Sequence, residues 1–157
     1  MKTAIIGGGA SGFFAAINTK ENFPNSEVSI FEKSSKLLSK VLISGGGRCN
    51  VTNSESSISN FSKSYPRGKK HLKKLFGIFN NQDTIEWFEN RGVEIVAEED
   101  GRMFPKSNTS QTIYNLFISE SEKLGVSVNL YDGLRIHWVK RGHKSDRCFN
   151  RLPRRAS

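Results

Sequence analysis

Three glycines near the start of the sequence have a spacing that suits phosphate binding. Gly7, Gly9 and Gly12 follow a short apolar run and precede residues that favour a helix. The first glycine of such a set permits a tight turn, the second lets a pyrophosphate approach the backbone, and the third brings the helix close to the strand. The N–H groups of Ala10 and Ser11 at the start of this helix would bind the phosphates, assisted by the helix dipole.

A carboxylate at a suitable distance completes this pattern. Glu32 lies twenty residues beyond Gly12, at the end of the next expected strand, where it can accept hydrogen bonds from the hydroxyls of an adenosine ribose. Its negative charge would repel a 2′-phosphate, so FAD or NAD is favoured over NADP. Two alternatives stay open: the glycines form a turn in an unrelated α/β protein, or Glu32 pairs only with a neighbour such as Lys33 or Lys36.

A second glycine cluster and a later segment carry a family resemblance. Residues 41–53 read VLISGGGRCNVTN and residues 101–107 read GRMFPKS. Together with residues 7–12 and the Glu32-Lys33 pair, these strings resemble signatures of the YhiN/BaiN-like flavoproteins, a family of NAD(P)/FAD-dependent oxidoreductases. The resemblance extends over residues 1 to about 130. It implies a Rossmann-like domain with FAD as cofactor and NAD(P)H as a candidate electron donor.

The second cluster supplies most of the further candidate cofactor contacts. Backbone N–H groups of successive glycines can lie against a flat ring or a phosphate. Arg48 could hold a pyrophosphate or the electron-rich pyrimidine end of a flavin. The alternative is a structural loop whose polar groups serve its own turns. Cys49 has no second cysteine at CxxC spacing, which favours a small packed residue over a redox thiol. The candidates added to those above are Lys33, Gly46, Gly47, Arg48, Cys49 and Asn50.

The resemblance also implies an activity and a missing portion. Flavin N5 would exchange a hydride with nicotinamide and with an unidentified small-molecule substrate. Proteins of this family are much longer, with an inserted substrate domain and a C-terminal return to the FAD domain. We therefore expect a truncated N-terminal FAD-binding fragment of an oxidoreductase, with a genuine short protein as the alternative. The alternative function is a non-catalytic nucleotide-binding module or remnant, and no catalytic acid or base is assigned.

The elements that must position these residues follow from apolar periodicity. Apolar runs predict parallel strands near residues 2–6, 27–31 and 126–130, with a helix after the first glycine cluster. The expected fold class is α/β: a Rossmann-like FAD/NAD(P)-binding domain, with a parallel sheet and flanking helices, that is incomplete. It would occupy residues 1–132, followed at 133–157 by a basic, disordered tail that lies outside the family resemblance. Further helices are expected near residues 69–79, 83–90 and 107–124, and a further strand at 93–96.

The positive charge of the chain is concentrated at its end. The 157 residues carry 24 Lys and Arg against 15 Asp and Glu, a net charge of +9. Residues 1–132 hold 16 against 14 and residues 133–157 hold 8 against 1, so the two parts carry +2 and +7. The nearly balanced charge of residues 1–132 therefore gives no indication of nucleic-acid binding. As an alternative, the tail could bind nucleic acid or an anionic membrane. A tail translated out of frame would show the same arginine-rich composition without any such function. The basic run at 67–74 is interpreted as the solvated face of a helix that buries its apolar residues.

Several other classes of protein do not fit the sequence. The two cysteines, Cys49 and Cys148, make no disulfide framework, and the three histidines lack metal-ligand spacing. No apolar run approaches the roughly 18 residues of a membrane span, and the N-terminus has no signal-peptide pattern. We therefore expect a cytoplasmic protein without a metal or a membrane partner. Its substrate and oligomeric state stay undetermined.

Overall fold

The computed structural model describes residues 1–141 and 144–151, which fall into two compact units. One unit combines Met1–Lys40 with Phe117–Ser157, and the other is Val41–Leu116. The candidate nucleotide loop lies in the first unit and the second glycine cluster in the other, so each is described by itself.

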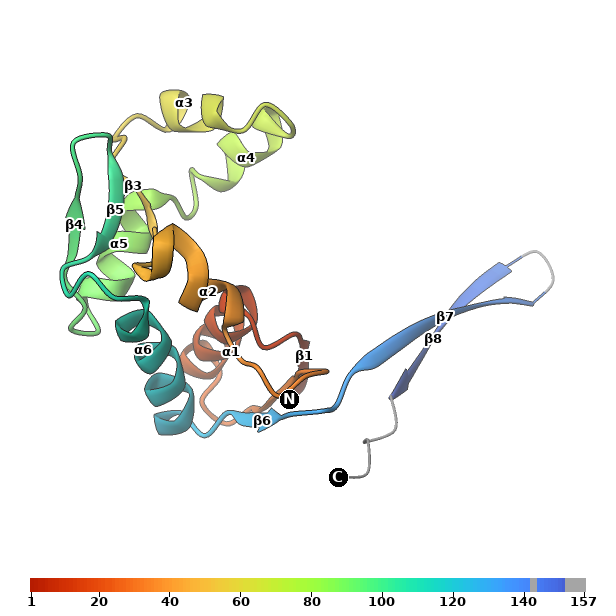
Figure 1. The fold of residues 1–157 in the computed structure, drawn as a ribbon. Helices are drawn as coiled ribbons and strands as arrows, with labels where there is room; N and C mark the ends of the chain where they lie inside the picture. The colour runs from red at the N-terminus through yellow and green to blue at the C-terminus, as the bar shows by residue number, and fades with distance from the viewer. Residues whose placement is uncertain (142–143, 152–157) are drawn as a thin grey trace. The chain divides into compact units, whose positions relative to one another are not determined.

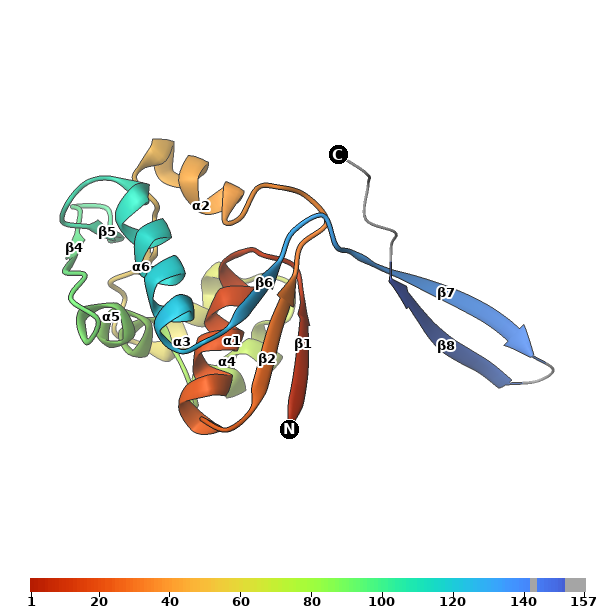
Figure 2. The ribbon, with the colours of Figure 1, turned by 90° about the horizontal axis from the view of Figure 1, so that it is seen from below.

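The first unit contains a parallel three-stranded sheet, as predicted. Its strands are β1 (Lys2–Ile6), β2 (Glu27–Phe31) and β6 (Ser127–Asn129), and their order is β1-β2-β6. Ile30 at the centre pairs with Ile5 on one side and Val128 on the other. Figure 2 shows β2 between its two neighbours. The sheet thus brings together two segments nearly a hundred residues apart in the sequence.

Helix α1 (Ala10–Asn22) connects β1 to β2 and buries one apolar face. Phe13, Ala16 and Ile17 have no exposed surface, and Val28 and Ile30 of β2 are also buried. The spacing of the three helical residues is that of one helix face. Helix α6 (Ser110–Lys123) contributes to the same core through Phe117, whose ring lies 6.1 Å from that of Phe13. This packing fixes the start of α1 relative to the ends of β1 and β2.

The second unit has a small antiparallel sheet. Its order is β3-β5-β4, with β5 (Arg102–Pro105) between β3 (Thr52–Asn53) and β4 (Ile95–Ala97) (Figure 1). Phe104 of β5 is nearly fully buried, as are Trp87 and Phe88 of α5. Asn80 and Asp83 form a reciprocal capping box at the start of α5. The elements outside β5 are α2 (Ser39–Ile43), η1 (Ser44–Gly47), β3 (Thr52–Asn53), α3 (Ile58–Phe61), η2 (Ser62–Ser64), α4 (Lys69–Leu75), α5 (Asn81–Glu89) and β4 (Ile95–Ala97).

Helix α4 corrects one prediction. The basic run was expected to bury the apolar residues on its other face, yet α4 contains no buried residue. Leu75 is 50% exposed and Ile78, just beyond the helix, is 82% exposed. Phe76 contacts Phe61 and Tyr65, with ring centroids 4.8 and 5.5 Å apart, so only a small aromatic cluster forms. Helical spacing was present, but the contacts of this face leave Leu75 and Ile78 largely exposed.

The C-terminal segment also differs from the expectation. Residues 133–157 were predicted to lack regular structure, whereas β7 (Leu134–Arg141) and β8 (Lys144–Arg151) pair as an antiparallel hairpin. The segment contains residue types that favour strands, among them Ile136, Trp138 and Val139. The arginines and lysines between these residues interrupt the apolar pattern from which a strand would be predicted. The boundary at residue 132 stays a prediction, and residues 142–143 and 152–157 lie outside the described residues.

Candidate functional site

The loop between β1 and α1 turns as tightly as its glycines predict. Gly7 has a φ of +107°, a left-handed conformation that favours glycine, and its N–H donates to the Phe31 carbonyl at 2.9 Å. A Cβ on Gly12 would lie 2.0 Å from the Gly7 carbonyl oxygen. Only glycine at position 12 therefore lets the first turn of α1 approach the end of β1 this closely.

Gly9 leaves an open space at the start of α1. It is the N-cap residue, with φ −92° and no side-chain hydrogen bond, and the first turn of the helix contains no acidic residue. A Cβ built on Gly9 meets no atom within 4 Å. The first N–H groups of a helix, here including those of Ala10 and Ser11, have no partner inside it and carry the positive end of the dipole. The loop therefore offers donors, positive potential and room for an anion.

Glu32 is bound to the glycine loop itself. Its Oε2 accepts the N–H of Gly8 at 2.9 Å, and its Oε1 accepts both the N–H and the hydroxyl of Ser34, each at 2.9 Å. The expected alternative was a pair with Lys33 or Lys36. Lys33 acts on Glu32 through its charge, while the hydrogen bonds come from Gly8 and Ser34. The carboxylate thus links the end of β2 to the loop after β1.

The surroundings of Glu32 lower the pKa of its carboxyl. Burial of the carboxylate acts in the opposite direction and raises it, but the N–H groups of Gly8 and Ser34, the Ser34 hydroxyl and the charge of Lys33 outweigh that effect. Each of these groups favours the ionised form. Glu32 is therefore a fixed anion at neutral pH, suited to accept hydrogen bonds from hydroxyl groups.

Three residues of this site were not predicted. Gly8 is buried, and a Cβ there would lie 2.5 Å from Cδ2 of Leu37. Its N–H is bound by Glu32 and its carbonyl accepts the N–H of Leu38 at 2.8 Å, so both of its polar groups are engaged. Ser34 and Leu38 hold this arrangement from the segment after β2. Gly8 is the middle one of three consecutive glycines, and this run was the available sequence signal, whereas nothing local marked Ser34 or Leu38.

The second glycine cluster forms a left-handed stretch of backbone. Gly45, Gly46 and Gly47 have φ values of +56°, +68° and +85° within η1. A Cβ on Gly45 would lie 2.8 Å from both the Asn50 nitrogen and Cε1 of Phe104, whereas one on Gly46 would meet nothing within 4 Å. Gly45 is therefore needed for packing, and Gly46 leaves an open backbone face.

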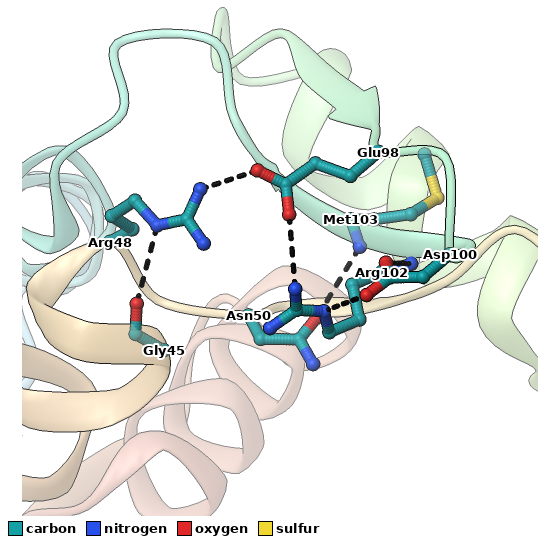
Figure 3. A network of polar contacts seen from close by, with 7 residues as sticks. All are labelled: Gly45, Arg48, Asn50, Glu98, Asp100, Arg102 and Met103. Carbon is teal, nitrogen blue, oxygen red and sulfur yellow. Dashed lines mark hydrogen bonds and ion pairs between the residues drawn. The ribbon is translucent and has the colours of Figure 1, made fainter.

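Arg48 is engaged by its own chain rather than free for a ligand. Figure 3 shows its guanidinium paired with Glu98 and its Nε turned towards the Gly45 carbonyl, 3.4 Å away. The guanidinium carbon also lies 4.0 Å from the centre of the Phe104 ring. Glu98 in turn contacts Arg102 at 3.4 Å. No local sequence signal marks Glu98 as the partner of Arg48, because the two residues are fifty positions apart.

The two residues after Arg48 serve the loop. Cys49 is 6% exposed, and burial raises the pKa of its thiol, which a hydrogen bond with Ser44 only partly offsets. This environment favours the packed-residue interpretation over a redox thiol. The Asn50 amide oxygen lies 3.3 Å from the Met103 nitrogen, and in the reversed amide orientation its nitrogen donates to the carbonyls of Met103 and Thr52. Asn50 thus joins the loop to β5.

Two kinds of site are not found in the part of the chain that the structure describes. No group of three or more His, Cys, Asp or Glu side chains could hold a metal ion. Within the same residues, no helix is long and apolar enough to cross a membrane.

The fold and the loop together define the class of protein. A parallel β-α-β unit with an open, donor-rich glycine turn and a carboxylate at the end of the second strand is a dinucleotide-binding Rossmann domain. The family model described as the HI0933-like protein Rossmann domain matches residues 1–149, so the chain belongs to this family. The predicted resemblance to the YhiN/BaiN-like proteins is thereby confirmed, and the match extends beyond the predicted limit at about residue 130.

Two curated relatives are similar to most of the chain. A 3-dehydro-bile acid delta(4,6)-reductase of Clostridium scindens is 31% identical over 139 residues, which are 88% of this chain and 32% of that protein. A ribosomal RNA dihydrouridine synthase of Haemophilus influenzae is 30% identical over 126 residues, 80% of this chain and 30% of that protein. The chain thus spans about a third of the length of these relatives.

A solved structure supports the fold alone. THI4 of Thermovibrio ammonificans matches with a TM-score of 0.58 at 15% identity, covering 95% of this chain and 47% of that one.

Proposed function

We propose that the chain binds the adenosine diphosphate portion of FAD and is the N-terminal part of a flavin-dependent oxidoreductase. The observation that carries this proposal is the pairing of an open space at Gly9 with a fixed anion at Glu32. The pyrophosphate would lie against Gly9 and the N–H groups of Ala10 and Ser11. Glu32 would accept a ribose hydroxyl, and Lys33 beside it is an exposed cation available to the nucleotide.

The second unit has candidate cofactor contacts of its own. FAD, when bound, supplies the hydride chemistry at its flavin ring, and the protein supplies binding and orientation. Within that unit, we propose the open backbone of Gly46 and Gly47 and the positive charge of Arg48 as groups that could contact a flat ring or a phosphate. Arg48 would have to exchange part of its contact with Glu98 for the cofactor, and such an exchange keeps its charge compensated in both states.

The reaction we propose is a reduction with NAD(P)H as the hydride donor. One relative is named as a reductase of a bile acid and the other as a synthase of dihydrouridine in ribosomal RNA, and dihydrouridine is a reduced form of a nucleoside. The two named substrates differ in size and chemistry, so neither is transferred to this chain. We propose a small-molecule substrate and assign it no catalytic residue.

A second candidate is a nucleotide-binding module without catalysis. The specific observation in its favour is that Arg48, Cys49 and Asn50 are all engaged in contacts within the chain. Under this hypothesis only the adenosine diphosphate portion is recognised, and the flavin ring adds nothing to affinity.

Calorimetric titration of the 157-residue chain with FAD, ADP and NADP⁺ tests both candidates. We expect ADP to bind, FAD to bind more tightly, and NADP⁺ to bind weakest because Glu32 repels its 2′-phosphate. Equal affinities for FAD and ADP would favour the module. Absence of binding by either FAD or ADP would overturn the proposal.

A further inference from the structure

The hydrogen bonds from the described residues leave Glu32 with one vacant acceptor position. An ionised carboxylate offers about four lone-pair sites, two on each oxygen. Oε1 accepts two hydrogen bonds from Ser34, and Oε2 accepts one from Gly8. All three donors lie 2.9 Å from their acceptors. The free site is therefore on Oε2, the oxygen that already faces the glycine loop.

The Ser34 hydroxyl is itself oriented towards Glu32. Its oxygen accepts the N–H of Lys36 at 3.2 Å, which leaves its proton to be donated. The proton has two acceptors in reach, Glu32 Oε1 at 2.9 Å and the Lys36 carbonyl at 3.4 Å. The carboxylate is both closer and charged, so it is the stronger acceptor. Ser34 thus occupies Oε1 completely.

We infer that Ser34 is a positioning residue. By occupying Oε1, it leaves Glu32 able to accept a hydrogen bond from a single ribose hydroxyl, through Oε2. This inference rests on the proposed nucleotide function. If both carboxylate oxygens were free, Glu32 could accept the 2′- and 3′-hydroxyls together, one on each oxygen. With Oε1 saturated by Ser34, only one hydroxyl finds a charged acceptor, and the other must be solvated or bound elsewhere.

The test compares ADP with 2′-deoxy-ADP and 3′-deoxy-ADP by calorimetry on the full chain. In the wild-type protein one analogue should lose roughly tenfold or more in affinity, because a hydrogen bond to a charged group is lost, while the other should bind within about twofold of ADP. Similar losses for both analogues would overturn the inference. Because this comparison uses the unaltered protein, it does not depend on whether any variant folds.

Variants then test the part played by Ser34. Ser34→Ala removes one of the two donors on Oε1, so the deoxy analogue that the wild type tolerates should now also bind more weakly than ADP, because its missing hydroxyl has gained an acceptor. Ser34→Thr keeps the hydroxyl and should restore the wild-type preference, and Ser35→Ala, at the exposed neighbouring hydroxyl, is the matched control. A role in loop stability alone would lower all affinities equally and leave the preference unchanged, which would overturn the inference. Failure of the wild-type chain to bind ADP would overturn the proposed function as well, so the two failures can be distinguished.

Discussion

The Glu32 carboxylate and the Gly8 N–H form a hydrogen bond of 2.9 Å between positions 24 residues apart. Because Gly8 is buried, its N–H would lose free energy of hydrogen bonding if the Glu32 carboxylate were removed, since water has poor access to it. Glu32 therefore serves the loop before any nucleotide arrives. A residue chosen from the sequence as a ligand contact is also part of the structure that shapes the ligand site.

Glu32→Ala should reduce both ADP affinity and stability. Loss of a charge-assisted hydrogen bond to ribose should weaken binding by about 10- to 150-fold, equivalent to roughly 1.5–3 kcal/mol. From the sequence alone, little change in stability would be expected for a carboxylate facing a crevice. Because the mutation leaves the buried Gly8 N–H without an acceptor, we expect a loss of about 1–3 kcal/mol in the free energy of unfolding. Calorimetry and urea unfolding measure the two effects; unchanged ADP affinity would remove Glu32 from the ligand site.

The stabilising effect of Glu32 should depend on pH. The pKa of Glu32 is lowered in the folded chain from its ordinary value of 4.5, so the folded state binds fewer protons than the unfolded state in that range. The stability that the carboxylate contributes is thus fully present above pH 4.5 and is lost as the pH falls through the lower, folded pKa. Urea unfolding of wild type and Glu32→Ala between pH 7 and about pH 3 checks this. A stability difference that stayed constant over the whole range would contradict it.

Gly9→Ala should separate binding from folding. The φ of −92° suits alanine and the new methyl group meets no atom of the chain, so the free energy of unfolding should change by no more than about 1 kcal/mol. The methyl group would occupy the space proposed for the pyrophosphate, and ADP affinity should fall by more than about tenfold. Adenosine, which lacks the phosphates, should bind equally to both proteins. If ADP bound Gly9→Ala normally, the phosphates would have to lie elsewhere.

Gly45→Ala and Gly46→Ala should differ although the two residues are neighbours. Both have positive φ, which costs an alanine about 1–2 kcal/mol. Only Gly45 is also in close approach, with Asn50 and Phe104 each 2.8 Å from the added Cβ, and overpacking of this kind adds about 1–3 kcal/mol. Urea unfolding should therefore rank Gly45→Ala as clearly less stable than Gly46→Ala. Equal effects would mean that the close contacts relax freely.

Cys49 should be unreactive in the folded chain. Its thiol is buried and has a raised pKa, so little thiolate is present at neutral pH and reagents cannot reach it. In a Cys148→Ser background, labelling with a maleimide should be slow until urea unfolds the protein. Rapid labelling of the native chain would restore the redox-thiol interpretation of Cys49.

Local patterns predicted the β-α-β unit because its information is short-range. The runs at 2–6 and 27–31 and the glycines between them appear in the structure as β1, β2 and their connecting turn. Strand β6, which pairs with β2 from far along the chain, was also predicted from its alternating residues. Four-residue β5 was not predicted, because Arg102–Pro105 shows no alternation that a reader of the sequence could use.

What could not be predicted depends on distant partners. Arg48 and Glu98 meet across fifty positions, and no sequence pattern links them. The exposure of Leu75 in α4 depends on whether another element covers that face, which helical spacing does not reveal. Ser34 lies only two residues from Glu32, but its importance follows from the geometry of both carboxylate oxygens.

The strand order β1-β2-β6 has a consequence for folding during synthesis. β1 and β2 emerge from the ribosome early, but the second neighbour of β2 is made about a hundred residues later. At about 5–20 residues per second, the edge of β2 stays unpaired for roughly 5–20 s. Such an open edge is a template for pairing with another chain. The interval is long enough for a chaperone to bind the nascent chain, and slowing translation between residues 32 and 126 should increase aggregation.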